Sequence, residues 1–190
     1  MVMTRALFDE PSIRPEHLCL SSEWFSPADI VEAARATLGS IDLDPASCEI
    51  ANRQVSASHI YTIDRDGLDP CNQWAGKVFL NPPNPAGPWW KRLVAEHAAG
   101  NVQRAIFIGY SIETAQQIQH WTPTAPLDQW PICIPKKRVR YMRVADQVDL
   151  ITGETALVRG AQPTHASIII GVGVVPDTFR RCFSQIGLCR

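Results

Sequence analysis

The apolar run Val78-Phe79-Leu80 is followed directly by the tetrapeptide Asn81-Pro82-Pro83-Asn84. Such a run predicts a buried strand, and the prolines end it because they cannot donate backbone hydrogen bonds to a neighbouring strand. They also stiffen the chain, which is expected to leave the carbonyl of Pro82 pointing outward in a fixed place. A helix that opens with Gly-Pro is predicted to follow, over residues 86–99.

The same alternation of strand and helix extends through most of the chain. Strands are predicted over residues 41–44, 60–62, 77–80, 104–110, 131–143 and 166–175, and helices over residues 27–38, 86–99, 113–120 and a short segment from residue 176. Ser26 is expected to cap the first helix, with Pro27 in its first turn, and residues 48–76 are expected to be irregular apart from the strand at 60–62. This alternation predicts an α/β fold with a doubly wound, mostly parallel, Rossmann-like sheet.

Length and composition limit the classes of protein to consider. The 190 residues suit one domain, residues 22–190, preceded by an N-terminal arm at 1–21. No apolar run approaches the roughly 20 residues of a membrane helix, and the charged N-terminal segment does not suit a secretory signal, so a cytoplasmic protein is expected. The six cysteines include no C-x-x-C pair, so no metal site is predicted. A net charge of −1 confines any nucleic-acid contact to a local patch.

Two polar strand exits lie where folds of this kind bind ligands, beyond the carboxyl ends of strands. They are Asp44-Pro45 and Asn81-Pro82-Pro83. The side-chain oxygen of Asn81 and the carbonyl of Pro82 form a pair of acceptors that can hold both N–H bonds of an aromatic amine and aim its lone pair at an electrophile. The alternative interpretation is an ordinary turn. The apolar strand before the prolines and the pair Trp89-Trp90 after them favour the functional interpretation.

Ordered motifs extend over about residues 22–173. They are Glu23-Trp24-Phe25-Ser26-Pro27, Leu43-Asp44-Pro45-Ala46-Ser47, Asp66-Gly67-Leu68 with Trp74, Val78-Phe79-Leu80-Asn81-Pro82-Pro83, Gly87-Pro88-Trp89-Trp90, Ile134-Pro135 leading to Arg138-Val139-Arg140-Tyr141, and Gln162-Pro163-Thr164-His165-Ala166-Ser167. In order and spacing this set resembles the phage-type DNA N6-adenine methyltransferases. The resemblance implies a methyltransferase fold, S-adenosylmethionine as cofactor, duplex DNA with a flipped adenine as substrate, and a bacterial host cell.

The resemblance also implies roles for individual residues. Asn81, Pro82 and Pro83 are implied to be catalytic. Cofactor contacts are implied for Trp24, Phe25, Ser26, Pro27, Asp44, Pro45, Ala46, Asp64, Asp66 and Leu68, with Asp44 near the amino group of the cofactor and Asp64 or Asp66 near its ribose or adenine. Contacts with the DNA substrate are expected for Asn84, Trp89, Trp90, Lys136, Lys137, Arg138, Arg140 and His165. For Asp64 a solvated loop or turn residue is the alternative.

Position 84 departs from the family pattern. The family usually has an aromatic residue there, which stacks on the flipped base, whereas this chain has Asn84. Trp89 or Trp90 is expected to supply the ring, and core packing of the helix is the alternative for both. Other acceptors therefore stay open: cytosine, a base in RNA, a protein glutamine, or a phage base that receives another group. A non-catalytic nucleic-acid-binding relic is a further alternative.

Residues 136–143 hold the main concentration of positive charge, Lys-Lys-Arg-Val-Arg-Tyr-Met-Arg. As a strand, this segment would place Lys136, Arg138 and Arg140 on one face and Lys137 on the other. Contact with DNA phosphates is the functional interpretation. An exposed edge strand protected by its charge is the alternative.

Overall fold

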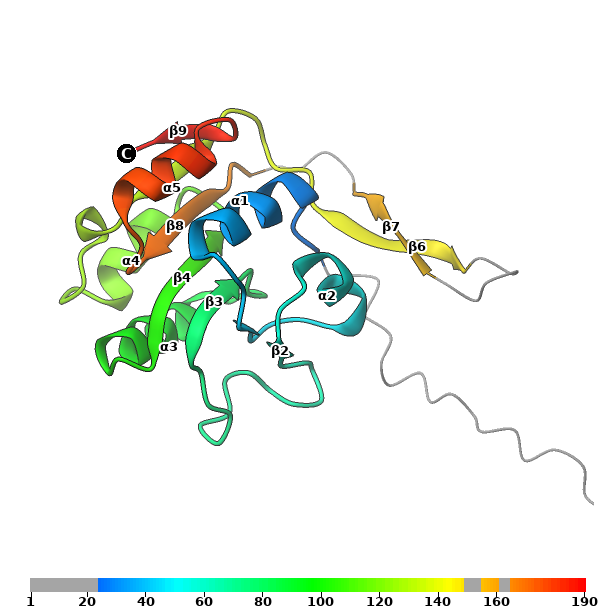
Figure 1. Ribbon diagram of the computed structural model, residues 1–190, viewed down its shortest axis with the longest axis horizontal. Coiled ribbons are helices and arrows are strands. Elements are labelled where there is room, and N and C mark those ends of the chain that lie inside the picture. Colours follow the sequence, from blue (N-terminus) through cyan, green and yellow to red (C-terminus); the bar gives the residue numbers. More distant parts are fainter. Residues whose placement is uncertain (1–23, 149–154, 161–164) are drawn as a thin grey trace, which may run out of the picture.

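A mixed β-sheet forms the centre of the molecule. The structure, a computed structural model, describes residues 24–148, 155–160 and 165–190 (Figure 1), so the predicted arm at 1–21 lies outside the described residues. In the described part, seven strands are hydrogen-bonded in the order β2-β1-β3-β4-β8-β5-β9. They are β1 (Leu43–Asp44), β2 (His59–Ile60), β3 (Gly76–Leu80), β4 (Val102–Gly109), β5 (Ile132–Pro135), β8 (Ile168–Val172) and β9 (Gly187–Cys189).

The strands of this sheet run mostly in one direction. Strands β2, β1, β3 and β4 pair in parallel, β8 pairs antiparallel with both β4 and β5, and β9 pairs antiparallel with β5. Therefore β1 to β5 point one way, and β8 and β9 point the other way. The predicted α/β class with a mostly parallel sheet is confirmed in this mixed form.

Helices cover both faces of the sheet, because the side chains of β3 and β4 alternate between two cores. One core packs against α1 (Ala28–Leu38) and α5 (Pro176–Phe183), and the other packs against α3 (Gly87–Ala98) and α4 (Thr114–Trp121). Phe79, Ile106 and Ile108 belong to the first core, and Val78, Leu80 and Phe107 belong to the second. The carboxyl ends of β1 and β3 are thereby held rigidly at one edge of the sheet.

A separate hairpin of β6 (Met142–Val148) and β7 (Thr155–Arg159) projects beyond the sheet (Figure 1). Its base is joined to the segment before α1. Phe25 donates a 2.8 Å backbone hydrogen bond to Met142 and accepts one of 2.7 Å from it. Residues 24–26 are thereby fixed beside the body of the protein.

Several local predictions are corrected by the structure. Pro27, not Ser26, occupies the N-cap position of α1, and no side chain caps that helix. The segment predicted to be irregular contains α2 (Glu49–Val55). Residues 136–141 form no strand: β5 ends at Pro135 and β6 begins at Met142. These differences matter because each of the three segments borders the candidate site.

Candidate functional site

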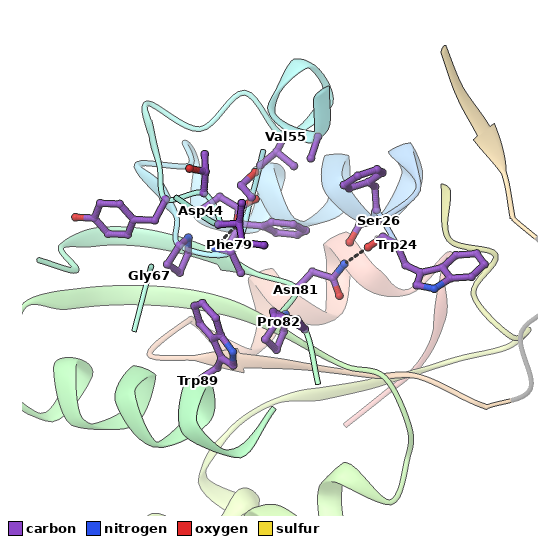
Figure 2. Close-up of a pocket in the computed structure, with 18 of the residues that line it drawn as sticks. Trp24, Ser26, Asp44, Val55, Gly67, Phe79, Asn81, Pro82 and Trp89 are labelled. Carbon is purple, nitrogen blue, oxygen red and sulfur yellow. Dashed lines mark hydrogen bonds between the residues drawn. The ribbon is translucent and has the colours of Figure 1, made fainter. Parts of the chain in front are cut away.

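A cavity of about 770 Å³ opens along the carboxyl ends of β1 and β3 (Figure 2). Its volume lies within the usual range for small-molecule and cofactor sites. The lining residues are 24–26, 44–47, 51, 54, 55, 61–63, 66, 67, 79, 81–84, 89, 110 and 141. Both strand exits identified in the sequence therefore border one cavity, as expected for neighbouring parallel strands.

Asp44 is the buried acid of this cavity. It ends β1, the residue is 3% exposed, and one carboxylate oxygen accepts a 3.2 Å hydrogen bond from the Ala46 backbone N–H. Burial raises the pKa of the Asp44 carboxyl to about 7, although the hydrogen bond from Ala46 opposes the shift. None of the ion pairs found among the described residues involves Asp44. The carboxylate is thus positioned to receive a cationic or hydrogen-bond-donating group in the cavity.

Ser26 adds a second buried polar group. The residue is 4% exposed, and its hydroxyl has no hydrogen-bond partner within the described part of the chain. A buried hydroxyl without a partner costs about 1–3 kcal/mol, so a polar ligand that reached it would bind more tightly. The rings of Phe25 and Phe79 also line the cavity, so charged and apolar surfaces lie next to each other.

Asn81 is held in one orientation by the segment before α1. Its Nδ2 donates a 3.1 Å hydrogen bond to the Trp24 carbonyl, shown as a dashed line in Figure 2. The Trp24 carbonyl can only accept, so the amide nitrogen must face it and Oδ1 must face the other way. Asn81 therefore presents an acceptor beside Pro82 on the cavity wall. The peptide bond between Asn84 and Pro85, just beyond, is cis.

The loop between β2 and β3 is packed tightly against the cavity. The rings of Trp74 and Trp89 stack with centroids 6.2 Å apart, and Trp74 Nε1 donates a 2.8 Å hydrogen bond to the Gly67 carbonyl. A Cβ atom at Gly67 would lie 1.9 Å from the Pro45 carbonyl oxygen, so no larger residue fits there without backbone movement. The Asp44-Pro45 exit and the Asp66-Gly67 turn are therefore in direct contact.

The cavity collects most of the residues implied to be catalytic or to bind the cofactor. Those that line it are Asn81, Pro82 and Pro83, together with Trp24, Phe25, Ser26, Asp44, Pro45, Ala46 and Asp66. Pro27, Asp64 and Leu68 are not part of its lining. Asp66 also accepts a 2.8 Å hydrogen bond from the Leu68 backbone N–H, which closes the turn that precedes the Trp74 contact.

The residues expected to contact the substrate divide into four groups. Asn84 and Trp89 line the cavity. Trp90 does not: it is fully buried against Phe107 and donates a 2.8 Å hydrogen bond to the Thr122 hydroxyl, so its assignment to the acceptor site is corrected to core packing. His165 is exposed and lies with its ring centroid 5.0 Å from that of Tyr110.

The basic residues form the fourth group, outside the cavity lining. Lys136, Lys137, Arg138 and Arg140 are all exposed, while Val139 and Tyr141 are buried. The alternation expected of a strand is therefore present at 138–141, although the segment is not hydrogen-bonded as one. Lys136 and Lys137 lie in a bend directly after β5, so the strand that would place them on opposite faces is not formed.

Several cavity residues were not identified from the sequence. Tyr110 follows β4 directly, so the strand-end rule that selected Asp44 and Asn81 would also have selected it. Tyr141 lines the cavity with its hydroxyl 2.8 Å from the Ser167 hydroxyl, and burial raises its pKa to about 12, so it is neutral near pH 7. Gln54 and Val55 come from α2, whose short length gives no clear periodic pattern.

Comparisons of the chain with protein-family models, with curated proteins and with solved structures give no match in any of the three. Within the described residues, no group of three or more His, Cys, Asp or Glu side chains is placed to hold a metal ion. No helix of the described part is long and apolar enough to cross a membrane.

Proposed function

We propose that the protein is a Rossmann-like, S-adenosylmethionine-dependent methyltransferase that acts on the exocyclic amino group of adenine in DNA. The observation that carries the proposal is the orientation of Asn81, whose Oδ1 is left as an acceptor because Nδ2 is bonded to the Trp24 carbonyl. This acceptor lies in the same cavity as the buried carboxylate of Asp44.

The donor set of the cavity fits this cofactor. The cofactor carries a positively charged amino group and a sulfonium, and it would supply the methyl group as an electrophile. The Asp44 carboxylate suits the ammonium group, and the Ser26 hydroxyl suits the polar methionine end. The rings of Phe25 and Phe79 provide the aromatic surface that a cation favours.

Asn81 and Pro82 then orient the acceptor amine. Each N–H bond of the amine would be held by one oxygen, Oδ1 of Asn81 or the carbonyl of Pro82, which favours a pyramidal nitrogen whose lone pair points away from both. The residues act by orientation and by stabilising the positive charge that develops on the nitrogen, and most of the barrier reduction is expected from these two effects. After transfer the positively charged nitrogen is a strong acid, and its proton passes to solvent water.

Transfer of a tritium-labelled methyl group from S-adenosylmethionine tests the proposal. Wild-type protein and Asn81→Ala would be incubated with mixed-sequence duplex DNA, with RNA and with glutamine-containing protein, and the labelled product would be digested and identified. Wild-type protein is expected to place the label in N6-methyladenine. The rate of this transfer is expected to be at least about 100-fold lower with Asn81→Ala. No label in DNA over varied sequences would exclude the proposal.

Asn84 favours one alternative within the same scaffold, a different acceptor. It lines the cavity and is exposed, and an asparagine provides no ring for a flipped base. Label in cytosine, RNA or a glutamine side chain, with none in adenine, would select this alternative. Mass spectrometry of nucleosides from cells that express the protein would detect a transferred group other than methyl.

A further inference from the structure

The rings that line the cavity differ sharply in what they can still contact. Five of them are buried to 9% exposure or less: Phe25, Tyr61, Phe79, Trp89 and Tyr141. Among these, Trp89 already stacks on Trp74. Of the rings that line the cavity, only Trp24 and Tyr110 have substantial exposure, at 47% and 39%.

Trp24 is poorly placed to stack on an acceptor held by Asn81. Its Cζ3 atom would lie 2.1 Å from a Cβ atom at Gly160, so its ring already packs closely against the backbone there. In Figure 2 the Trp24 ring points away from Asn81, although its carbonyl receives the Asn81 hydrogen bond. The exposed ring of Trp24 therefore faces the outer side of the cavity.

Tyr110 is placed on the acceptor side by the sheet itself. Strands β3 and β4 are parallel neighbours with Leu80 paired to Phe107, so Asn81 follows one strand where Tyr110 follows the other, at the same edge of the sheet. The ring centroid of Tyr110 lies 5.0 Å from that of His165, at an interplanar angle of 46°. The ring is thus supported from one side while more than a third of the residue stays exposed.

We propose that Tyr110 supplies the aromatic surface on which the acceptor base stacks, in place of the ring that is missing at position 84. This inference rests on the proposed function and narrows it: the acceptor is the amino group of a planar base and not a glutamine side-chain amide. Base stacking on an aromatic side chain is sequence-tolerant, and its loss is expected to raise the KM for DNA by about 10-fold to 100-fold.

Four variants test the role of the ring: Tyr110→Phe, Tyr110→Leu, Tyr110→Ala and the double variant Tyr110→Ala with Asn84→Tyr. Initial rates of label transfer would be measured over a range of concentrations of mixed-sequence duplex DNA, and S-adenosylmethionine affinity would be measured by calorimetry. Tyr110→Phe is expected to keep the wild-type KM for DNA within about 2-fold. Tyr110→Leu and Tyr110→Ala are expected to show the raised KM with unchanged cofactor affinity, and Asn84→Tyr is expected to recover DNA methylation.

The outcomes separate this inference from the proposed function. If wild type methylates adenine and Tyr110→Leu keeps the wild-type KM for DNA, the role of Tyr110 is overturned while the methyltransferase assignment stands. Equal losses of cofactor affinity and DNA affinity in Tyr110→Leu would also overturn it, because they indicate a structural effect. If wild type labels glutamine and leaves DNA unlabelled, both fail.

Discussion

The side-chain nitrogen of Asn81 lies 3.1 Å from the backbone oxygen of Trp24, and this hydrogen bond determines which end of the amide faces the cavity. The relationship joins two segments that are 57 residues apart in the chain. An aspartate at position 81 would keep an acceptor toward the substrate but would place a carboxylate oxygen against the Trp24 carbonyl. Two acceptors at that distance repel each other, so asparagine and aspartate are not equivalent in this site.

Asn81→Asp is therefore expected to lower kcat for label transfer by at least about 100-fold, the same loss that is expected for Asn81→Ala. Asn84→Asp is the matched control, because it introduces the same charge three residues further along the cavity wall, away from the Trp24 carbonyl that Asn81 contacts. That control is expected to lose less than about 10-fold. Similar losses in both variants would show that negative charge, not amide orientation, is the cause.

Asp44 is expected to make cofactor binding depend on pH. Its pKa is raised to about 7 by burial, so below pH 7 the carboxyl is mostly neutral and lacks the charge that suits an ammonium group. Affinity for S-adenosylmethionine is expected to rise as the pH increases from about 6 to about 8. Calorimetry between about pH 6 and about pH 8 measures this affinity. The control, Asp44→Asn, is expected to bind S-adenosylmethionine weakly and with an affinity that does not rise with pH.

The same shift has the opposite consequence for the protein without ligand. In the native state the Asp44 carboxyl holds its proton up to about pH 7. In the unfolded chain the same carboxyl loses its proton near pH 4. Between about pH 4 and about pH 7 the native state therefore binds more protons than the unfolded state. The contribution of Asp44 to stability is therefore full below about pH 4 and falls as the pH rises to about 7. Asp44→Asn is expected to raise Tm relative to wild type at about pH 8 and to bring no such gain at about pH 4.

Strands β1 to β5, strand β8 and the two strand exits were predicted from the sequence because they depend on local signals, whereas β9 was not predicted. Val78-Phe79-Leu80 is apolar without interruption, as a strand buried on both faces requires, and the prolines after Asn81 mark its end. The placing of Asp44 and Asn81 in one cavity then follows from the rule for parallel strands.

The parts that the sequence did not predict depend on distant contacts. Nothing near Asn81 indicates that its amide is turned by the Trp24 carbonyl. Nothing near Trp90 indicates that it is buried away from the cavity, whereas Trp89, which is also part of the core, lines it. Helix α2 has seven residues, too few for a periodic pattern to be distinguished from a polar loop. Tertiary packing determines all three.

Arg92 is expected to stabilise the loop that borders the cavity. Its guanidinium donates hydrogen bonds to the carbonyls of Gly67, Asp69 and Asn72 and lies over the Trp74 ring, 5.1 Å from the centroid. Arg92→Lys keeps the charge, but a single ammonium cannot reach three carbonyls and the ring together. We expect its free energy of unfolding to fall by about 2–3 kcal/mol in urea titrations.

The neighbouring Lys91 provides the control for Arg92. It is exposed on the same helix, so Lys91→Ala is expected to change the free energy of unfolding by no more than about 0.5 kcal/mol. Hydrogen exchange adds a local readout: Arg92→Lys is expected to speed exchange over residues 62–74 more than elsewhere. Uniformly faster exchange over the whole chain would contradict a clamp on this loop.

The exposed basic segment is expected to determine the salt dependence of DNA binding. Lys136, Lys137 and Arg140 can be replaced by alanine together while the fold is kept, because the segment is anchored by the buried Tyr141 and the three side chains are exposed. Each phosphate interaction that the substitutions remove should reduce the slope of log affinity against log salt by about 0.9, so the triple variant should show a slope lower by roughly 2–3. Fluorescence anisotropy with a labelled duplex, repeated over several salt concentrations, measures this slope.

A matched control removes the same charge from other elements. It replaces Lys91, Arg104 and Arg181 by alanine, all three at exposed positions, and should leave the slope unchanged. If both triple variants reduce the slope equally, net charge and not this segment determines the salt dependence of DNA binding.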